Sequence, residues 1–270
     1  MLRPRFVVMS MYSGASGGTG KSTLAAGLAV LLSRYLSADT ALIDLGSTAA
    51  STRLLGVVPS GAGVLDYLAG VVGDVGRVIT RSSLVPTVHV VPPGMPPSIE
   101  YVLDTSPEDL GKRWEGLLYG LLEHTSSRVV IIDLPPNPPR WVVDTILPRS
   151  QVVNLVLENT STSEYVLAEI DSTVTRGLAS GGRVVNIVLN KTVPGVDITD
   201  RVRGFARGGF ITTLPLSPIT HYLVASMKLP VLYQAGGTLA DFQRVLEQVA
   251  SQLTRQVRIL LTGRVEYGQA

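Results

Sequence analysis

The chain has 270 residues, of which 45% are hydrophobic and 16% are charged, and its formal net charge is +2. A chain this apolar is not intrinsically disordered, and the near balance of charges gives no general affinity for nucleic acid. The absence of cysteine excludes disulfides, thiolate metal sites and iron–sulfur clusters held by cysteine. We expect a single domain over residues 1–270, with a C-terminal tail of unassigned role at 255–270.

Targeting signals are not evident in the sequence. No stretch approaches the roughly 18 consecutive apolar residues of a membrane span. The N-terminal apolar run leads directly into a glycine-rich loop, so we interpret it as a core strand and not as a signal peptide. We therefore expect a cytoplasmic protein.

Short apolar runs alternate with helical patterns along the chain. Strands are predicted over residues 5–12, 40–44, 87–91, 128–133, 151–157, 183–189 and 210–214. Helices are predicted over residues 22–36, 64–70, 107–123, 140–147, 161–178, 217–227 and 238–261. Several strands are continuous apolar runs, which suit a parallel sheet covered on both faces. The alternation predicts a doubly wound α/β fold, a mostly parallel sheet with helices on both faces and ligands at the carboxyl ends of its strands.

The loop between the first strand and the first helix has the composition of a phosphate-binding loop. Residues 14–23 read Gly-Ala-Ser-Gly-Gly-Thr-Gly-Lys-Ser-Thr. Glycines allow successive backbone N–H groups to face one anion, and the helix adds its positive N-terminal end. In such loops the lysine reaches the β- and γ-phosphates and the following hydroxyl binds Mg²⁺. The predicted nucleotide-binding residues are Ser16, Gly17, Gly18, Thr19, Gly20, Lys21, Ser22 and Thr23.

One position departs from the strict pattern G-x-x-x-x-G-K-[ST], because Ala15 stands where the first glycine is expected. The alternative interpretation is a flexible glycine linker between two elements. A linker has no need of Gly-Lys-Ser-Thr at the start of a helix, so we favour the phosphate loop.

Two aspartates end predicted strands. Asp133 follows Val-Val-Ile-Ile, and a carboxylate at such a strand tip beside a phosphate loop is suited to holding Mg²⁺ with Ser22. Asp44 ends Ala-Leu-Ile in the same way. With Lys21 they form the predicted catalytic set, although a strand-terminal aspartate can equally cap a turn.

Asn190 and Lys191 follow another apolar strand. The asparagine amide offers both a donor and an acceptor, which suits the edge of an adenine ring. By itself, an asparagine after a strand is more typical of a turn.

In order and spacing, these pieces resemble the MinD/ParA family of P-loop ATPases, which carry a deviant Walker A motif. The resemblance covers about residues 6–250. It rests on Gly17–Thr23, Asp44, Asp133-Leu-Pro-Pro136, Asn190-Lys191, Leu214-Pro-Leu-Ser-Pro218 and Lys228-Leu-Pro-Val231. It implies that Lys21, Ser22 and Thr23 hold the phosphates of ATP and Mg²⁺ and that Asp133 is the Walker B carboxylate. It also implies that Asn190, with the backbone near Pro215, contacts adenine, and that Lys191 lies beside them at the nucleotide. Family members typically form ATP-sandwiched homodimers and exchange partners or surfaces with the ATP/ADP state.

Two positions depart from the family pattern. Ser16 replaces the extra lysine that reaches the other subunit's nucleotide, and Gly46 replaces the second aspartate, which positions the attacking water. Loss of a comparable cation costs roughly 10³–10⁵ in rate in related enzymes. We expect an atypical member that binds ATP·Mg²⁺ and hydrolyses it slowly, unless another cation such as Arg53 substitutes.

Three functions remain open at this point. The first is a nucleotide-switched protein that positions or partitions other components, and the second is a nearly non-catalytic ATP-binding scaffold for pilus or appendage assembly. The third is a bacterial-type tyrosine kinase domain. Against the kinase, Gly17 stands where proline is usual, residues 44–48 lack D-x-D-x-R, and Tyr267 stands without a tyrosine cluster.

The partner surfaces give weaker signals. Arg201, Arg203 and Arg207 surround Phe205, which suits non-specific DNA binding or simply a solvated face. Residues 256–264 mix arginine with apolar side chains, as in a short membrane anchor whose polar face is weak. The helix 238–261 has an apolar side that predicts core packing, and we interpret Trp114, Trp141 and the three histidines as structural or surface residues.

Overall fold

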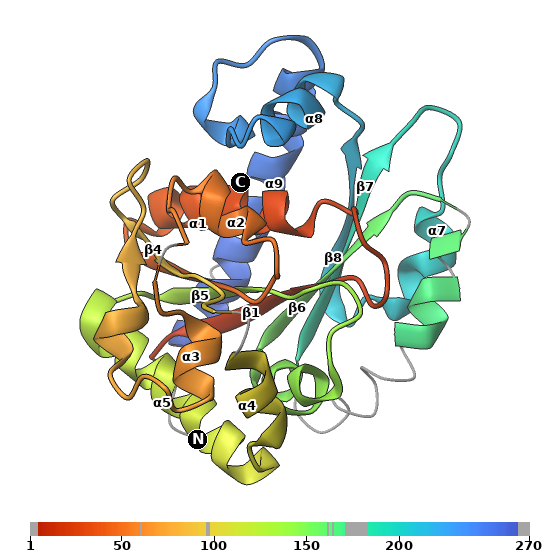
Figure 1. Ribbon diagram of the computed structural model, residues 1–270. Helices are drawn as coiled ribbons and strands as arrows, with labels where there is room; N and C mark the ends of the chain where they lie inside the picture. Colours follow the sequence, from red (N-terminus) through yellow and green to blue (C-terminus); the bar gives the residue numbers. More distant parts are fainter. Residues whose placement is uncertain are drawn as a thin grey trace.

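The computed structural model describes residues 5–59, 61–95, 98–160, 162–163, 165–170 and 183–263. In this part of the chain, eight strands form one sheet in the order β3-β4-β2-β5-β1-β6-β7-β8 (Figure 1). Neighbouring strands are parallel, apart from the antiparallel pair β3–β4. The strands are β1 (Val7–Tyr12), β2 (Thr40–Asp44), β3 (Thr80–Arg81), β4 (Val88–Val91), β5 (Val129–Asp133), β6 (Val152–Glu158), β7 (Val184–Thr192) and β8 (Gly208–Pro215).

Helices follow most of the strands. They are α1 (Lys21–Leu36), α2 (Ala50–Leu54), α3 (Val64–Leu68), α4 (Ser98–Asp104), α5 (Pro107–Thr125), α7 (Thr199–Val202), α8 (Pro218–Ala225) and α9 (Gly237–Thr262). Within the described part of the chain, none of these helices has the length and the apolar run that a bilayer crossing demands. Of the helix predicted over 161–178, residues 162–163 and 165–170 are helical, and the rest lies outside the described residues.

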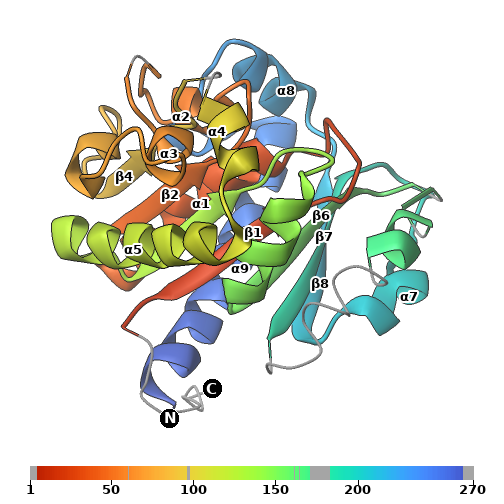
Figure 2. The same cartoon turned by 60° about the horizontal axis from the view of Figure 1, so that its bottom comes forward.

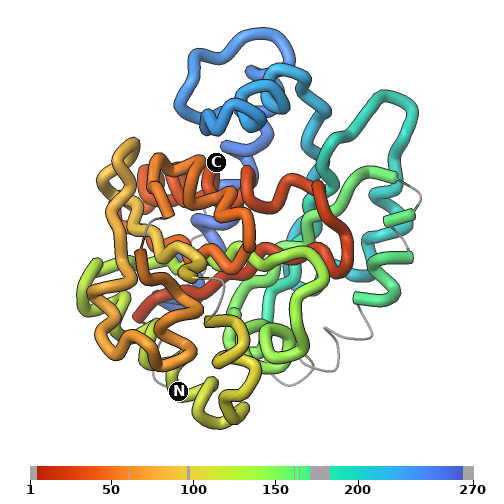
Figure 3. The backbone as a smooth tube through the Cα atoms, viewed as in Figure 1, coloured from red at the N-terminus to blue at the C-terminus, as the bar shows by residue number. Residues whose placement is uncertain are grey.

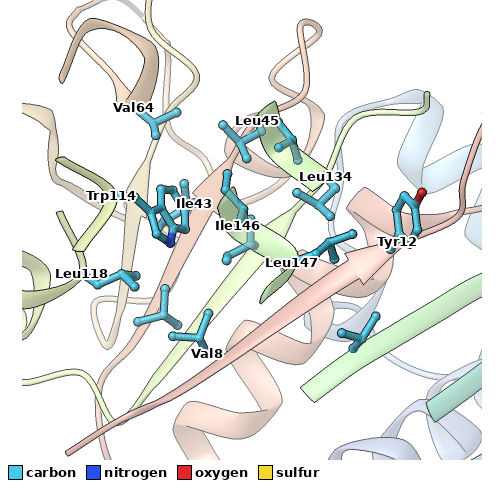
Figure 4. Packing of buried hydrophobic residues seen from close by; sticks show 14 of the residues in the cluster. Val8, Tyr12, Ile43, Leu45, Val64, Trp114, Leu118, Leu134, Ile146 and Leu147 are labelled. Atoms are coloured by element: carbon cyan, nitrogen blue, oxygen red, sulfur yellow. The ribbon is translucent and has the colours of Figure 1, made fainter. Parts of the chain in front are cut away.

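Both faces of the central strands β4, β2, β5, β1 and β6 are buried, as the apolar runs predict. In β1, Val7, Met9 and Met11 belong to the core layer under α1 and α9. Val8 and Tyr12 point to the other layer, with α5 and its neighbours (Figure 4). This alternation reflects the two-residue repeat of a strand. The sheet therefore separates two helical layers, with α5 in front and α9 behind in Figure 2, and the predicted doubly wound α/β fold is confirmed.

The long helices are also confirmed. Trp114 on α5 is fully buried against the strands, and Trp141 packs at the edge of the same layer. The apolar residues that the periodicity places on one side of α9 are all buried: Leu239, Phe242, Leu246, Val249 and Leu253. Residues 255–262 form the last turns of α9, where Val257 is buried and Leu260 and Leu261 pack against the core. That part of the proposed anchor is thus core helix; residues 264–270 lie outside the described residues.

The structure differs from the prediction mainly in short elements. Helices α2 and α4 and the two-residue β3 were not expected, because five to seven residues carry too little periodicity to be recognised. The predicted helix 140–147 becomes a π-helical turn at Val142–Ile146 followed by a 3₁₀ turn at Leu147–Arg149. Pro148 has no N–H for a regular α-helical bond, which accounts for the change of winding there.

Candidate functional site

The loop between β1 and α1 is shaped by glycines. Gly18 and Gly20 have φ angles of +70° and +92°, which are accessible to glycine and strained for other residues. Gly20 is the residue before the first turn of α1, and a Cβ there would also collide with the amide of Asn190. The loop therefore approaches both the helix terminus and the tip of β7 closely.

A cavity of about 540 Å³ opens beside this loop, at the carboxyl ends of the central strands. Among the predicted site residues, it is lined by Gly18, Thr19, Gly20, Lys21, Ser22, Thr23, Asp133, Asn190, Lys191 and Pro215. Ser16, Gly17 and Asp44 are not part of its lining. The cavity thus gathers the ends of β5, β7 and β8 around the start of α1.

Lys21 is a buried cation that has no carboxylate partner in the described part of the chain. Its side chain is 6% exposed, and its ammonium donates to the Ser13 hydroxyl at 2.6 Å and to the Ser16 carbonyl oxygen at 3.4 Å. Within the described chain, no acidic side chain forms an ion pair with it. Burial lowers the pKa of Lys21, and the charge of Asp133 acts in the opposite direction. Buried charges are normally compensated, so the site favours an incoming anion.

Asp133 is the complementary case. It is 1% exposed, and neither carboxylate oxygen has a hydrogen-bond partner of ordinary geometry among the described residues. Burial and the charge of Asp44 raise the pKa of Asp133 to about 7, while the Ser22 and Ser51 hydroxyls and Lys21 act in the opposite direction. A buried carboxylate whose oxygens lack partners fits a divalent cation, and the Ser22 hydroxyl beside it is a further oxygen ligand.

Asp44 lies next to Asp133 across the β2–β5 ladder, but its oxygens are occupied. It accepts hydrogen bonds from the backbone N–H of Gly46 at 2.9 Å and from the N–H and hydroxyl of Thr52 at 3.0 and 2.8 Å. Burial raises the pKa of Asp44, whereas these hydrogen bonds act to lower it. Its carboxylate therefore holds the turn before α2, which brings residues 46–48 to the cavity wall.

At the opposite wall, Asn190 is 7% exposed and donates through Nδ2 to the Thr19 carbonyl oxygen at 2.8 Å. Lys191 follows with φ +57° and pairs with Glu158 at 2.5 Å. The tips of β6 and β7 are therefore tied to each other and to the phosphate loop.

Comparison with known proteins decides the family. The model of the CobQ/CobB/MinD/ParA nucleotide-binding domain matches residues 11–265. This chain belongs to that family. No curated protein matches the chain at a significant level.

Solved structures of MinD and ParA proteins have the same fold. The septum site-determining protein MinD of Pyrococcus horikoshii OT3 with Mg-ADP has a TM-score of 0.73 at 17% identity, over 95% of this chain and 99% of that one. A putative plasmid partition protein of Borrelia burgdorferi B31 bound to AMPPNP has a TM-score of 0.73 at 16% identity, over 93% and 99%. The McdA(D38A)–ATP complex of Cyanothece has a TM-score of 0.70 at 18% identity, over 98% and 99%.

The two departures from the MinD/ParA pattern lie beside the cavity. Ser16 contributes its carbonyl oxygen, which accepts from the Ser13 hydroxyl at 2.6 Å and from Lys21. Gly46 contributes its N–H to Asp44. Neither position supplies the charge of the family pattern.

Sequence reasoning missed part of the cavity and of its support. Ser13 anchors Lys21 and stands just before the recognised motif. The additional lining residues are Gly46, Ser47, Thr48, Ala50, Leu134, Pro135, Pro136, Leu216, Ser217, Thr220, His221, Val224 and Phe242. His221, which the sequence indicates is a structural or surface residue, is exposed on α8 and also lines the cavity. The motif at residues 214–218 indicated that this loop and the start of α8 lie near the nucleotide site. It did not indicate which of their side chains line the cavity.

Proposed function

We propose that this chain binds ATP with Mg²⁺ in the cavity beside the phosphate loop and uses the bound nucleotide as a switch to position another component. One observation carries the proposal: two buried charges of opposite sign, Lys21 and Asp133, adjoin the same cavity, and neither forms an ion pair within the described chain. A magnesium triphosphate supplies an anion for one and a cation for the other.

The cavity contains residues suited to the phosphates and the magnesium ion, and two further hydroxyls suited to a polar part of the ligand. Lys21, Ser22 and Thr23 would hold the phosphates, with Ser22 and Asp133 on the magnesium ion. The ion, when bound, neutralises charge on the phosphate oxygens. The buried hydroxyl oxygens of Thr19 and Thr220 have no partner among the described residues, and both residues line the cavity. A polar ligand would satisfy them.

We further propose that hydrolysis is slow. Phosphoryl transfer needs cationic stabilisation of the spreading oxygen charge and an oriented water, and Ser16 and Gly46 remove the family's residues for both. Asp44 would act indirectly, since its oxygens already hold the turn before α2. Arg53 is a candidate substitute cation, because its Nε donates to the carbonyl oxygen of Thr48, a residue of the cavity wall.

The decisive experiment is calorimetric titration of the full chain with MgATP, MgADP and MgGTP. We expect saturable binding by the wild type and loss of binding in Lys21→Ala. Lys112→Ala is the matched control, because Lys112 lies exposed on α5 and pairs with the surface carboxylates of Glu108 and Asp109. Absence of heat and saturation with the wild type would overturn the proposal. A turnover of about 1 s⁻¹ or faster, already within the usual enzyme range, would contradict slow hydrolysis.

The alternatives differ in how the protein behaves once the nucleotide is bound. A switch predicts an ATP-dependent homodimer that ADP does not support, whereas a scaffold for pilus or appendage assembly predicts binding without turnover or exchange of state. Detection of phosphotyrosine on the protein after incubation with ATP would favour the tyrosine kinase.

We place the protein in the cytoplasm, with DNA or membrane as the surface that it binds reversibly. Sedimentation with DNA and with liposomes, each with and without ATP, distinguishes these surfaces.

A further inference from the structure

Asn190 makes an unusual long-range bond to the phosphate loop. Its Nδ2 donates to the Thr19 carbonyl oxygen at 2.8 Å, across 171 positions of sequence. The bond is buried, and it stands where the neighbouring Gly20 has no side chain to obstruct the amide. The glycine at position 20 thus serves the approach of Asn190 as well as the turn.

The backbone around Asn190 is held from β6. Asn190 pairs in register with Glu158, and its carbonyl oxygen accepts from the Asn159 N–H at 2.9 Å. The ion pair between Lys191 and Glu158 joins the same ends of β6 and β7. The amide of Asn190 is therefore presented to the loop from a rigid part of the sheet.

The bond to Thr19 determines the direction of the next amide. In a trans peptide the C=O of one residue and the N–H of the following residue point to opposite sides. Holding the Thr19 carbonyl against Asn190 therefore directs the Gly20 N–H away from Asn190. Among the described residues no acceptor takes that N–H. An unpaired backbone N–H in a loop at a helix N-terminus is the donor that a phosphate oxygen requires.

We propose that Asn190 is a positioning residue for the phosphate loop, and that it strengthens binding of the phosphates whatever base they carry. This inference rests on the proposed nucleotide binding. It assigns Asn190 a role other than the adenine contact that the family resemblance implies.

The test compares ligands with and without a base. Asn190→Ala and Asn190→Asp are titrated with MgATP, MgGTP and magnesium tripolyphosphate. Loss of one hydrogen bond should raise all three dissociation constants of Asn190→Ala by a similar factor, about three- to tenfold, with the ATP-to-GTP ratio unchanged. Asn190→Asp should be affected more strongly, because a carboxylate would face the Thr19 carbonyl and the phosphates.

Asn137→Asp is the matched control for the change of amide to carboxylate. Asn137 is exposed just after β5, and its backbone N–H bonds to the Gly14 carbonyl oxygen at 2.9 Å. It should retain wild-type affinities. Circular dichroism checks the fold of each variant. If Asn190→Ala does not fold, the comparison is made with Asn190→Asp alone.

Two outcomes overturn the inference in different ways. If Asn190 variants lose the preference between ATP and GTP while tripolyphosphate binds as before, Asn190 reads the base, and the proposed nucleotide binding stands. If the wild type binds none of the three ligands, both the inference and the proposed function fail.

Discussion

Asp44 and Asp133 end neighbouring parallel strands and are both buried, but their surroundings differ. Asp44 accepts three hydrogen bonds from the segment that follows it. The Asp133 oxygens have no partner of ordinary geometry among the described residues. The same residue type at the same strand position thus stabilises a turn in one case and remains available to a ligand in the other.

This difference makes the stability of the ligand-free protein depend on pH. Because the pKa of Asp133 is raised from 3.8 to about 7, the folded chain binds more protons than the unfolded chain between these values. The free energy of unfolding should therefore fall as pH rises from about 4 to above 7. Ionising Asp133 in the folded chain costs on the order of 4 kcal/mol. Urea unfolding with EDTA at pH 5 and pH 8 measures the change.

Asp133→Asn should lose most of this dependence and should exceed the wild type in stability at pH 8. Some dependence of the unfolding free energy on pH should remain in this variant, because the pKa of Asp44 is also raised. Asp241→Asn is the control, because Asp241 is an exposed residue of α9 paired with Arg244, and it should behave as the wild type. Equal pH dependence in the wild type and Asp133→Asn would contradict this account.

Much of the site was predictable at the level of residues. The phosphate-loop motif and the strand-terminal aspartate placed Lys21 and Asp133 together, because carboxyl ends of parallel strands share one edge. The occupied oxygens of Asp44 and the bond from Asn190 to Thr19 were not predictable. They depend on a five-residue helix and on a contact between distant segments, and neither leaves a local pattern in the sequence.

At the level of elements, α8 has an unusual distribution of apolar side chains. Thr220, His221 and Val224 face the cavity, while Ile219 and Tyr222 are 43% and 67% exposed. The backbone trace places this segment (blue, top) above the loop after β1 (red) (Figure 3). We infer that this outer face of α8 is part of the contact in the proposed ATP-dependent homodimer, because it stands at the rim of the cavity and exposes apolar side chains.

We therefore expect Ile219→Glu to weaken the proposed ATP-dependent homodimer at least tenfold while MgATP still binds the monomer. The reason is that dimerisation would bury a charge without a partner. Analytical ultracentrifugation with ATP or ADP measures the equilibrium. Leu103→Glu is the control, because Leu103 is similarly exposed on α4, away from the cavity. A wild-type dimer that persists unchanged in Ile219→Glu would place the contact elsewhere.

At the level of the whole molecule, the sheet was predictable because its central strands are buried on both faces. Continuous apolar runs such as β5 and β6 admit few other structures, and right-handed crossovers then determine most of the topology. The antiparallel β3 was not predictable, since both of its residues are exposed and show no alternation. Short exposed elements such as β3 therefore could not be predicted from hydrophobic patterns in the sequence.

The same topology predicts how ligand binding affects global stability. The cavity is lined by residues from Gly18 to Phe242, which are far apart in sequence and join only in the folded chain. A ligand that binds only the folded state raises the free energy of unfolding by about 2.7 kcal/mol at one hundred times its dissociation constant. MgATP should therefore raise the urea midpoint of the wild type with no change in the slope of the transition. Lys21→Ala should show no such rise and Lys112→Ala the full rise, whereas a changed slope would mean that only part of the sheet is stabilised.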